Sequence, residues 1–325
     1  MRGKKILHQL DREKKQKKRR LLVKKWAVIL AVFFLINFSI KLINNYRNSI
    51  WDGNYRLNFV ITNTQNLYLA SFDPRNENIT LMKIPPNTIL EVPYGYGKYQ
   101  VQFLEKLEEI ENRPDLTEKT VRENFGLAVD GWVRVGEGDP ETKRNFEKLI
   151  FQLVEGKGKT NFSVWDIWRL WWQARKVKET DFQKLNLEQM GVFTKDKLPD
   201  QSWVLLLDKA VFDQRVRNIF NDQMIRLENL SVVVLNGTDY SGLAERLSRI
   251  LVNSGVNVVA VGNSEEPIKS CLVKSPKSLK GSKTVALIRR LWNCLWQEEN
   301  EAGRADISLI LGQDYLNFLM EKNQE

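Results

Sequence analysis

The strongest constraint on the fold of this chain is an apolar stretch near its N-terminus. The run WAVILAVFFLINFSIKLI occupies residues 26–43 and carries one charge, Lys41, near its far end. About 20 apolar residues in a helix cross a bilayer, and a lysine near a helix end extends its amine to the head groups. The sequence therefore predicts a transmembrane helix over residues 26–43, in contact with the lipid bilayer.

Two other interpretations of this run are a buried core helix and a cleaved signal peptide. Almost every side chain in it is large and apolar. A helix that packs on the core of a soluble protein usually keeps a polar face toward water. The basic region before it is long, and no cleavage site of the small-x-small type follows it. An uncleaved membrane anchor is the favoured interpretation.

The charge distribution gives the anchor a direction. Residues 1–25 hold 12 Lys and Arg against 2 Asp and Glu; from chain totals of 50 and 40, this leaves 38 of each in residues 26–325. Basic flanks remain in the cytoplasm, so we expect a cytoplasmic tail over residues 1–25 and an extracytoplasmic location for residues 44–325. The charge-balanced exterior lacks the excess of cations that binds phosphate backbones, so no nucleic-acid partner is predicted.

The missing residue types limit the chemistry of the exterior part. The only histidine, His8, lies in the basic tail, and the chain has two cysteines. A histidine-based triad, histidine metal ligands and a cysteine-rich zinc site are therefore excluded outside the membrane. We expect no metal and no cofactor.

The exterior part divides into a polar linker, residues 44–54, and two α/β domains, residues 55–229 and 230–318, before a polar tail, residues 319–325. Short apolar runs separated by turn residues in the first domain predict strands, and amphipathic patterns predict helices. The expected strands are 56–62, 66–72, 79–84, 129–136 and 202–208; the expected helices are 99–111, 116–126 (N-cap Thr117, stop Gly126), 143–156, 163–177 and 211–222.

The helix expected at residues 163–177, SVWDIWRLWWQARKV, is rich in tryptophan and basic residues. The tryptophans recur at spacings that place them on one face. One interpretation is a stripe in the core; the other is an amphipathic face for a lipid, a glycan or a polyprenyl phosphate, because Trp suits interfaces and sugar rings. The candidate binding residues are Trp165, Trp168, Arg169, Trp172 and Arg175.

The second domain repeats strand and helix in about 90 residues. Strands are expected at 231–237, 256–263, 268–275 and 305–312, and helices at 241–255 and 283–296. Between the first strand and helix lies a glycine turn with four candidate ligand residues, Asn236, Gly237, Thr238 and Gly242. Backbone amides at such a turn can bind an anion, but no Lys or Arg stands in the loop, so a purely structural corner is the preferred interpretation.

The two cysteines, Cys271 and Cys294, both fall in this second domain. Cys271 is expected in a strand and Cys294 late in the following helix, pointing toward the sheet. Outside the cytoplasm a disulfide is favoured; the alternative is two buried free thiols.

Two segments of the sequence resemble known protein families. The sequence VVVLNGT…GLAERLSRILVNSGVNVVAVGNS, with the closing ADISLILGQDY, resembles the LytR C-terminal domain over residues 230–318. That module ends many bacterial cell-envelope proteins and implies no reaction. LYLASFDPRNENITLMKIPPNT and LTEKTVRENFGLAVDGWVRV resemble the LytR-CpsA-Psr domain, whose members transfer polyprenyl-phosphate-linked glycopolymers outside the membrane, with arginines on the diphosphate and aspartates at a magnesium ion.

Residues 55–229 depart from that family pattern. Pro86 and Asn87 stand where the family has Arg-Asp, residues 62–66 (TNTQN) lack the expected acids, and Trp172 stands at the position of a second arginine in RLWWQ. Proline cannot pair with phosphate, and an amide is a poorer magnesium ligand than a carboxylate. We therefore expect a degenerate, non-catalytic domain.

The expected protein is a membrane-anchored, extracytoplasmic bacterial envelope protein that binds or scaffolds in cell-wall or surface-glycopolymer assembly. Its expected partners are peptidoglycan, a polyprenyl-linked glycopolymer or envelope proteins. The alternatives are an active polyprenyl-phosphate glycopolymer transferase and, disfavoured by the anchor and the neutral exterior, a transcriptional regulator.

Overall fold

The computed structural model describes residues 26, 30, 32–34, 36, 37, 40, 46, 47, 49–64, 66–299 and 305–320. The chain divides into two compact units, residues 1–49 and 50–325. Most of the predicted membrane helix over 26–43, and the whole basic tail, lie outside the described residues. The described positions within 26–43 are helical. In the described part of the chain, no helix combines the length and apolarity that crossing a bilayer requires, so the anchor remains a prediction.

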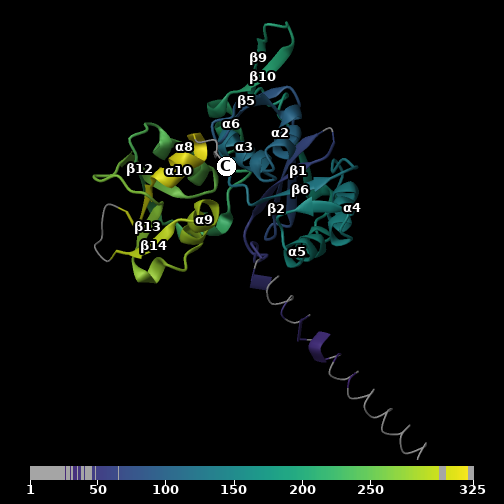
Figure 1. Cartoon of the computed structure of the whole chain (residues 1–325), viewed down its shortest axis with the longest axis horizontal. Helices are drawn as coiled ribbons and strands as arrows, with labels where there is room; N and C mark the ends of the chain where they lie inside the picture. The colour runs from purple at the N-terminus through teal and green to yellow at the C-terminus, as the bar shows by residue number, and fades with distance from the viewer. Residues whose placement is uncertain are drawn as a thin grey trace, which may run out of the picture. The chain divides into compact units, whose positions relative to one another are not determined.

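The second unit begins with a six-stranded mixed sheet (Figure 1). Strand β2 pairs antiparallel with β1 and β3, β7 pairs antiparallel with β6, and β1–β6 and β3–β8 are parallel pairs. In sheet order the strands are β7 (Gly158–Thr160), β6 (Gly131–Val135), β1 (Leu57–Thr62), β2 (Leu67–Asp73), β3 (Asn78–Ile84) and β8 (Phe182–Asn186).

The central strands of this sheet are buried on both faces. In β1, Phe59 and Ile61 join the apolar core that α4 (Lys143–Val154) and α5 (Val164–Ala174) cover, whereas Val60 joins the core on the other face. Successive residues of a strand point to opposite faces, so a strand covered on both sides reads as a nearly continuous apolar run.

A smaller sheet and several helices complete the first domain. The sheet contains β5 (Gly97–Gln100), β4 (Thr88–Val92), β10 (Trp203–Leu207) and β9 (Phe193–Lys197), and β9 and β10 form the hairpin at the top of Figure 1. The helices are η1 (Val101–Phe103), α2 (Leu104–Ile110), α3 (Leu116–Phe125), η2 (Glu179–Asp181), α6 (Lys209–Val216) and α7 (Gln223–Glu228).

The C-terminal domain has its own five-stranded sheet and apolar core. Helix α8 buries one stripe, including Leu247 and Leu251, against β11 and β12. In sheet order the strands are β12 (Asn257–Asn263), β11 (Ser231–Asn236), β15 (Ile307–Leu311), β13 (Leu272–Ser275) and β14 (Leu295–Glu298); the helices are α8 (Leu243–Asn253), η3 (Lys277–Leu279), α9 (Lys283–Trp292) and α10 (Gln313–Met320).

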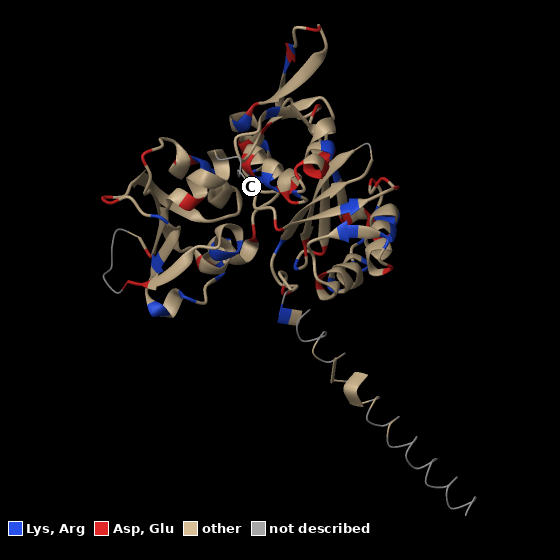
Figure 2. Cartoon of the chain, in the orientation of Figure 1, with Lys and Arg blue, Asp and Glu red and all other residues tan. Residues whose placement is uncertain are grey.

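Acidic and basic residues are interspersed along the second unit (Figure 2), as expected from the even count of acids and bases. The mixed α/β class and most of the expected elements are confirmed. Several expected bounds are wrong. The helix expected at 99–111 starts as strand β5 and 3₁₀ turn η1, and Thr117 lies inside α3 rather than capping it. The helices expected at 211–222 and 283–296 end at Val216 and Trp292, and the strand expected at 268–275 begins at Leu272.

The disulfide prediction is confirmed, because Cys271 and Cys294 are bonded with their Cα atoms 4.7 Å apart. The position expected for Cys294 is wrong, since it follows the end of α9 instead of lying in it. Both cysteines directly precede Leu272 and Leu295, which are register partners in the parallel pair β13–β14. This pairing, not a helix face, brings the two sulfur atoms together.

Candidate functional site

The polar candidates of the first domain gather at one edge of the six-stranded sheet. Strands β1, β3, β6 and β8 all run in the same direction, so their carboxyl ends lie at this edge. Ligands of open α/β sheets bind outside the carboxyl ends of the strands. The segments that follow these strands are residues 63–66, 85–87, 136–142 and 187–191.

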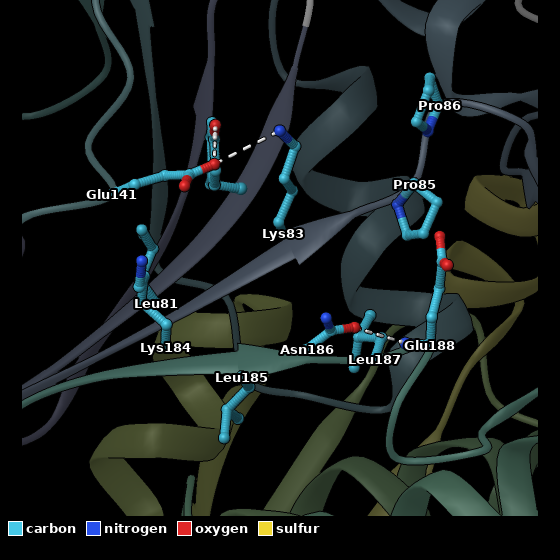
Figure 3. Close-up of a pocket in the computed structure, with 11 residues that line it drawn as sticks. Leu81, Lys83, Pro85, Pro86, Glu141, Lys184, Leu185, Asn186, Leu187 and Glu188 are labelled. Atoms are coloured by element: carbon cyan, nitrogen blue, oxygen red, sulfur yellow. Dashed lines mark hydrogen bonds and ion pairs between the residues drawn. The ribbon is translucent and has the colours of Figure 1, made fainter.

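A cavity of about 360 Å³ opens at this edge (Figure 3). Lys83 points toward Glu141, with Lys83 Nζ 3.3 Å from Glu141 Oε1. An exposed pair of this kind contributes little to stability, but it neutralises one of the two lysines of the cavity. The lining residues are Tyr68, Leu81, Lys83, Pro85, Pro86, Glu141, Lys184, Leu185, Asn186, Leu187 and Glu188.

Pro86 also lines a second cavity, of about 390 Å³. Its wall combines apolar side chains with the turn that connects β1 to β2. The lining residues are Thr62, Asn63, Thr64, Asn66, Leu67, Pro86, Val101, Gln102, Leu104, Glu105 and Thr117.

The acid missing from the turn at residues 62–66 is supplied by another loop. Asp139 Oδ1 accepts hydrogen bonds from Asn63 Nδ2 at 3.0 Å, Asn66 Nδ2 at 3.1 Å and the Tyr68 hydroxyl at 2.8 Å. The Tyr68 hydrogen bond, followed by those of the two amides and the charge of Lys83, lowers the pKa of Asp139 below its usual value despite an opposing effect of burial. The carboxylate is therefore ionised at neutral pH.

Sequence reasoning missed Asp139 and Glu141, because each lies more than 70 residues from Tyr68, to which both are hydrogen-bonded. The signal for them was the acidic run EGDPE directly after a predicted strand. Burial raises the pKa of the Tyr68 phenol, and the two carboxylates raise it further, so Tyr68 remains a neutral hydrogen-bond donor. Among the residues that the structure describes, no group of three or more His, Cys, Asp or Glu side chains is placed to hold a metal ion.

The pair Pro86-Asn87 forms a corner between β3 and β4. Asn87 Nδ2 donates to the carbonyl of Trp203 at 3.2 Å, and the Asn87 carbonyl accepts from Leu205 N at 3.1 Å. The Pro86 carbonyl accepts from Gln102 N at 3.0 Å. Asn87 therefore joins the smaller sheet through its side chain and its backbone, and its amide is directed toward β10.

The tryptophans predicted on one face of α5 are largely exposed. Trp168 is 47% and Trp172 is 52% exposed, while Ile167, Leu170 and Ala174 fill the core. The interpretation of these tryptophans as a core stripe is therefore wrong for Trp168 and Trp172. The structure keeps this cluster separate from both cavities, because none of its residues lines either one.

The two arginines of that cluster have different surroundings. The Arg169 guanidinium donates to the Trp51 carbonyl and lies 4.0 Å from Asp166 Oδ1. The Arg175 guanidinium lies 4.9 Å from the centre of the Trp171 ring, an arrangement typical of a cation–π contact. The two side chains do not converge on a shared anion site.

The C-terminal domain is similar to a known family of domains. Residues 229–315 match the family model described as LytR cell envelope-related transcriptional attenuator. This segment is a LytR C-terminal domain. A search of curated protein sequences returned no significant match.

Solved structures of LytR-CpsA-Psr proteins are similar to part of the chain. The transcriptional regulator YvhJ of Bacillus subtilis is 12% identical with a TM-score of 0.38, covering 50% of this chain and 94% of its own. TagV of B. subtilis is 10% identical with a TM-score of 0.39, covering 50% and 95%, and TagT of B. subtilis is 12% identical with a TM-score of 0.39, covering 51% and 89%. Likeness at this level does not determine an activity.

The glycine turn of the LytR C-terminal domain uses its polar groups internally. Asn236 Oδ1 accepts from Thr238 N at 3.1 Å and from the Thr238 hydroxyl at 2.8 Å, and Asn236 Nδ2 donates to the Tyr240 carbonyl at 2.8 Å. Gly237 N donates to the Leu311 carbonyl, and Gly242 precedes α8 with φ +86°. Four hydrogen-bond donors that an anion would need are therefore already used within the domain. They are the backbone N–H groups of Gly237 and Thr238, the Thr238 hydroxyl and the Asn236 side-chain amide.

Proposed function

We propose that this chain is a membrane-anchored, extracytoplasmic cell-envelope protein that binds or scaffolds during cell-wall or surface-glycopolymer assembly, without catalysing the transfer itself. The observation that carries the proposal is the LytR C-terminal domain over residues 229–315. The basic tail, the apolar run at 26–43 and the charge-balanced remainder support the placement outside the membrane.

The sheet edge supports binding rather than transfer. Gripping a diphosphate requires several cations in fixed positions, because each charge-assisted hydrogen bond contributes about 1.5–3 kcal/mol. Only two lysines line the first cavity, and one of them, Lys83, is already paired with Glu141. Asn87 is engaged by β10, which supports a structural role for the position where the resembling family has an acid.

The alternative is a polyprenyl-phosphate glycopolymer transferase whose catalytic groups have moved. Two cavities at the carboxyl edge of the sheet favour it, with the side chains of Asp139 and Glu141 beside them. In this alternative these two carboxylates substitute for the acids missing from residues 62–66.

Incubation of the full chain in proteoliposomes with a polyprenyl-diphosphate-linked glycopolymer and MgCl₂ separates the two functions. We expect no magnesium-dependent release of the lipid phosphate. Release that disappears in Asp139→Asn would establish the transferase and overturn the scaffold proposal.

Binding is measured by co-sedimentation of the full chain in detergent with purified cell-wall sacculi that carry or lack their anionic glycopolymer. We expect co-sedimentation, reduced several-fold in Lys184→Gln, which removes a cavity cation, and unchanged in Lys195→Gln, which removes an exposed lysine of β9 outside both cavities. Absence of wild-type binding to either kind of sacculi would contradict a wall-binding role.

The location is tested by adding protease to intact cells and to spheroplasts. We expect residues 50–325 to be cleaved from the outside, with the first 25 residues protected. Protection of the large unit would contradict the proposed topology.

A further inference from the structure

Helix α5 exposes an aromatic surface that the cavities and the core do not use. The rings of Trp168 and Trp172 are stacked, with centroids 6.1 Å apart and planes 15° apart, and Trp165 meets Trp168 edge-on at 6.4 Å. Val164, at 63% exposed, extends this surface at the start of the helix. Contiguous exposed aromatic surface of this kind marks an interaction site. We refer to Val164, Trp165, Trp168 and Trp172 as the tryptophan face.

The tryptophan face is a fixed feature of the fold. Ser163 and Asp166 form a reciprocal capping box that sets the start of α5. Ile167, Leu170 and Ala174, on the opposite side of the helix, are buried against the sheet. Because the core side is already filled, the helix cannot rotate to bury its tryptophans.

The neighbouring helix and the basic residues extend the same surface. Phe151 and Val154 of α4 are each 40% exposed, and the Phe151 ring lies 5.5 Å from the Trp171 ring; α4 and α5 lie side by side (Figure 1). After α5 come Arg175, Lys176 and Lys178, all exposed. Tryptophan flanked by basic side chains is the composition of protein surfaces at the lipid head groups.

The start of the second unit is bonded directly to this helix. Asp166 accepts hydrogen bonds from Ile50 N at 3.2 Å and from Trp51 N at 3.1 Å. Arg169 donates to the Trp51 carbonyl, and Gln173 Nε2 donates to the Gly53 carbonyl at 3.3 Å. On the helix, Arg169 lies one turn from Trp165 and Trp172, so the entering chain runs beside the tryptophan face.

Chain connectivity therefore limits how far this face can lie from the predicted anchor. Ile50 follows the end of the apolar run 26–43 by seven residues, and seven residues span at most about 25 Å. If the run crosses the membrane, the link keeps Ile50, which is bonded to α5, within about 25 Å of the outer end of the run. No such constraint applies to a glycan or to a partner protein.

We propose that the tryptophan face inserts into the head-group region of the outer leaflet and is a second membrane contact, in addition to residues 26–43. This inference rests on the membrane anchor of the proposed function. Two contacts restrict the rotation of the second unit on its anchor and hold the sheet edge with its two cavities at a fixed height above the lipid. The basic residues after α5 make the contact stronger on anionic lipid.

Quenching of tryptophan fluorescence by brominated lipid tests the proposal on the full chain in proteoliposomes of phosphatidylcholine and phosphatidylglycerol. The emission of a given tryptophan is obtained as the difference between wild type and a Trp→Phe variant. We expect brominated lipid to quench the emission of Trp168 and Trp172 at least several-fold more strongly than the emission of Trp203. The first is obtained from Trp168→Phe/Trp172→Phe and the second from Trp203→Phe.

Trp203 is the matched control, because it is 57% exposed and lies on the β9–β10 hairpin, at the other end of the view from α5 in Figure 1. Phenylalanine at these exposed positions keeps an apolar ring, and circular dichroism confirms that each variant is folded. Equal, weak quenching of the Trp168/Trp172 and Trp203 emissions would overturn the proposal.

A fourth protein, Trp26→Phe, separates this inference from the anchor. Quenched Trp26 emission with unquenched Trp168 and Trp172 emission leaves the anchor in place and removes the second contact. Unquenched Trp26 emission removes the anchor, and with it the basis of the inference.

Discussion

Arg249 of the LytR C-terminal domain forms a bidentate ion pair with Asp213 of the preceding domain, with Nε–Oδ2 at 2.6 Å and Nη2–Oδ1 at 2.9 Å. The same guanidinium donates to the carbonyls of Asn124 and Phe125, at 2.9 and 3.0 Å. These carbonyls lie at the C-terminus of α3 and have no hydrogen-bond partner within the helix. A cation at this end also interacts favourably with the helix dipole. One side chain of the second domain thus caps a helix of the first.

Arg249→Ala should lower the free energy of unfolding by about 2–4 kcal/mol, because it leaves Asp213 unpaired and two carbonyls uncapped. Arg246→Ala is the control, since its partner Glu91 is 54% exposed at the side chain and a loss below about 1 kcal/mol is expected. Urea unfolding of the full chain in detergent measures both. Equal losses in the two variants would show that the cap is energetically unimportant.

Gly126→Ala should be destabilising for two reasons. Gly126 follows α3 with φ +63°, where a side chain costs about 1–2 kcal/mol, and an added Cβ would lie 2.6 Å from the Arg249 guanidinium carbon. Gly242→Ala isolates the backbone cost, because φ there is +86° and nothing lies within 4 Å of the added atom. Urea midpoints should show a larger loss for Gly126→Ala than for Gly242→Ala.

Removal of Arg249 provides the test of that contact. In the Arg249→Ala background, the additional cost of Gly126→Ala should fall to that of Gly242→Ala. Strictly additive effects in this double-mutant cycle would contradict a direct contact between the two positions.

Glu118 predicts a pH dependence of stability. Burial raises the pKa of Glu118 from 4.5 to about 7, although the charges of Arg122 and Lys119 oppose the shift. Between pH 4.5 and 7 the folded chain therefore binds more protons at this site than the unfolded chain, and this site's contribution to stability decreases as pH rises through that range. At pH 8 the charged form costs on the order of 3 kcal/mol.

Glu118→Gln should remove this decrease and raise the urea midpoint at pH 8, with little change at pH 4.5. Glu179→Gln, at an exposed acid of η2, is the control and should leave the profile unchanged. A wild-type profile that rises or stays flat between pH 4.5 and 7, with no response to Glu118→Gln, would refute the assignment.

The disulfide should contribute about 3 kcal/mol, since it closes a loop of 23 residues. Cys271→Ser/Cys294→Ser should lower the thermal midpoint, and reductant should lower the wild-type midpoint to a similar degree without affecting the variant. Mass measurement after alkylation of the native protein reports the bond directly. Two alkylated thiols without reductant would mean that the bond is absent from the protein.

Local patterns in the sequence were sufficient to predict the elements that depend on short-range physics. Short apolar runs predicted β1, β2 and β3, the helical pattern of residues 163–177 predicted α5, and Gly126 predicted the end of α3. The polar strands β8 and β9, with sequences FQKLN and FTKDK, were not predicted. They form because β3 and β10 offer unpaired edges, which no local pattern reveals.

The candidate membrane segment, the charge-balanced remainder and the C-terminal domain can all be identified from the sequence, because these properties depend on residues close together in the chain. Two other features become visible only in the folded chain: Asp139 completes the turn at Asn63, and Trp168 and Trp172 face outward. A distant carboxylate reaches Asn63 through strand order, and the tryptophans are exposed because Ile167 and Leu170 already occupy the core. Both outcomes depend on contacts between segments that the sequence separates.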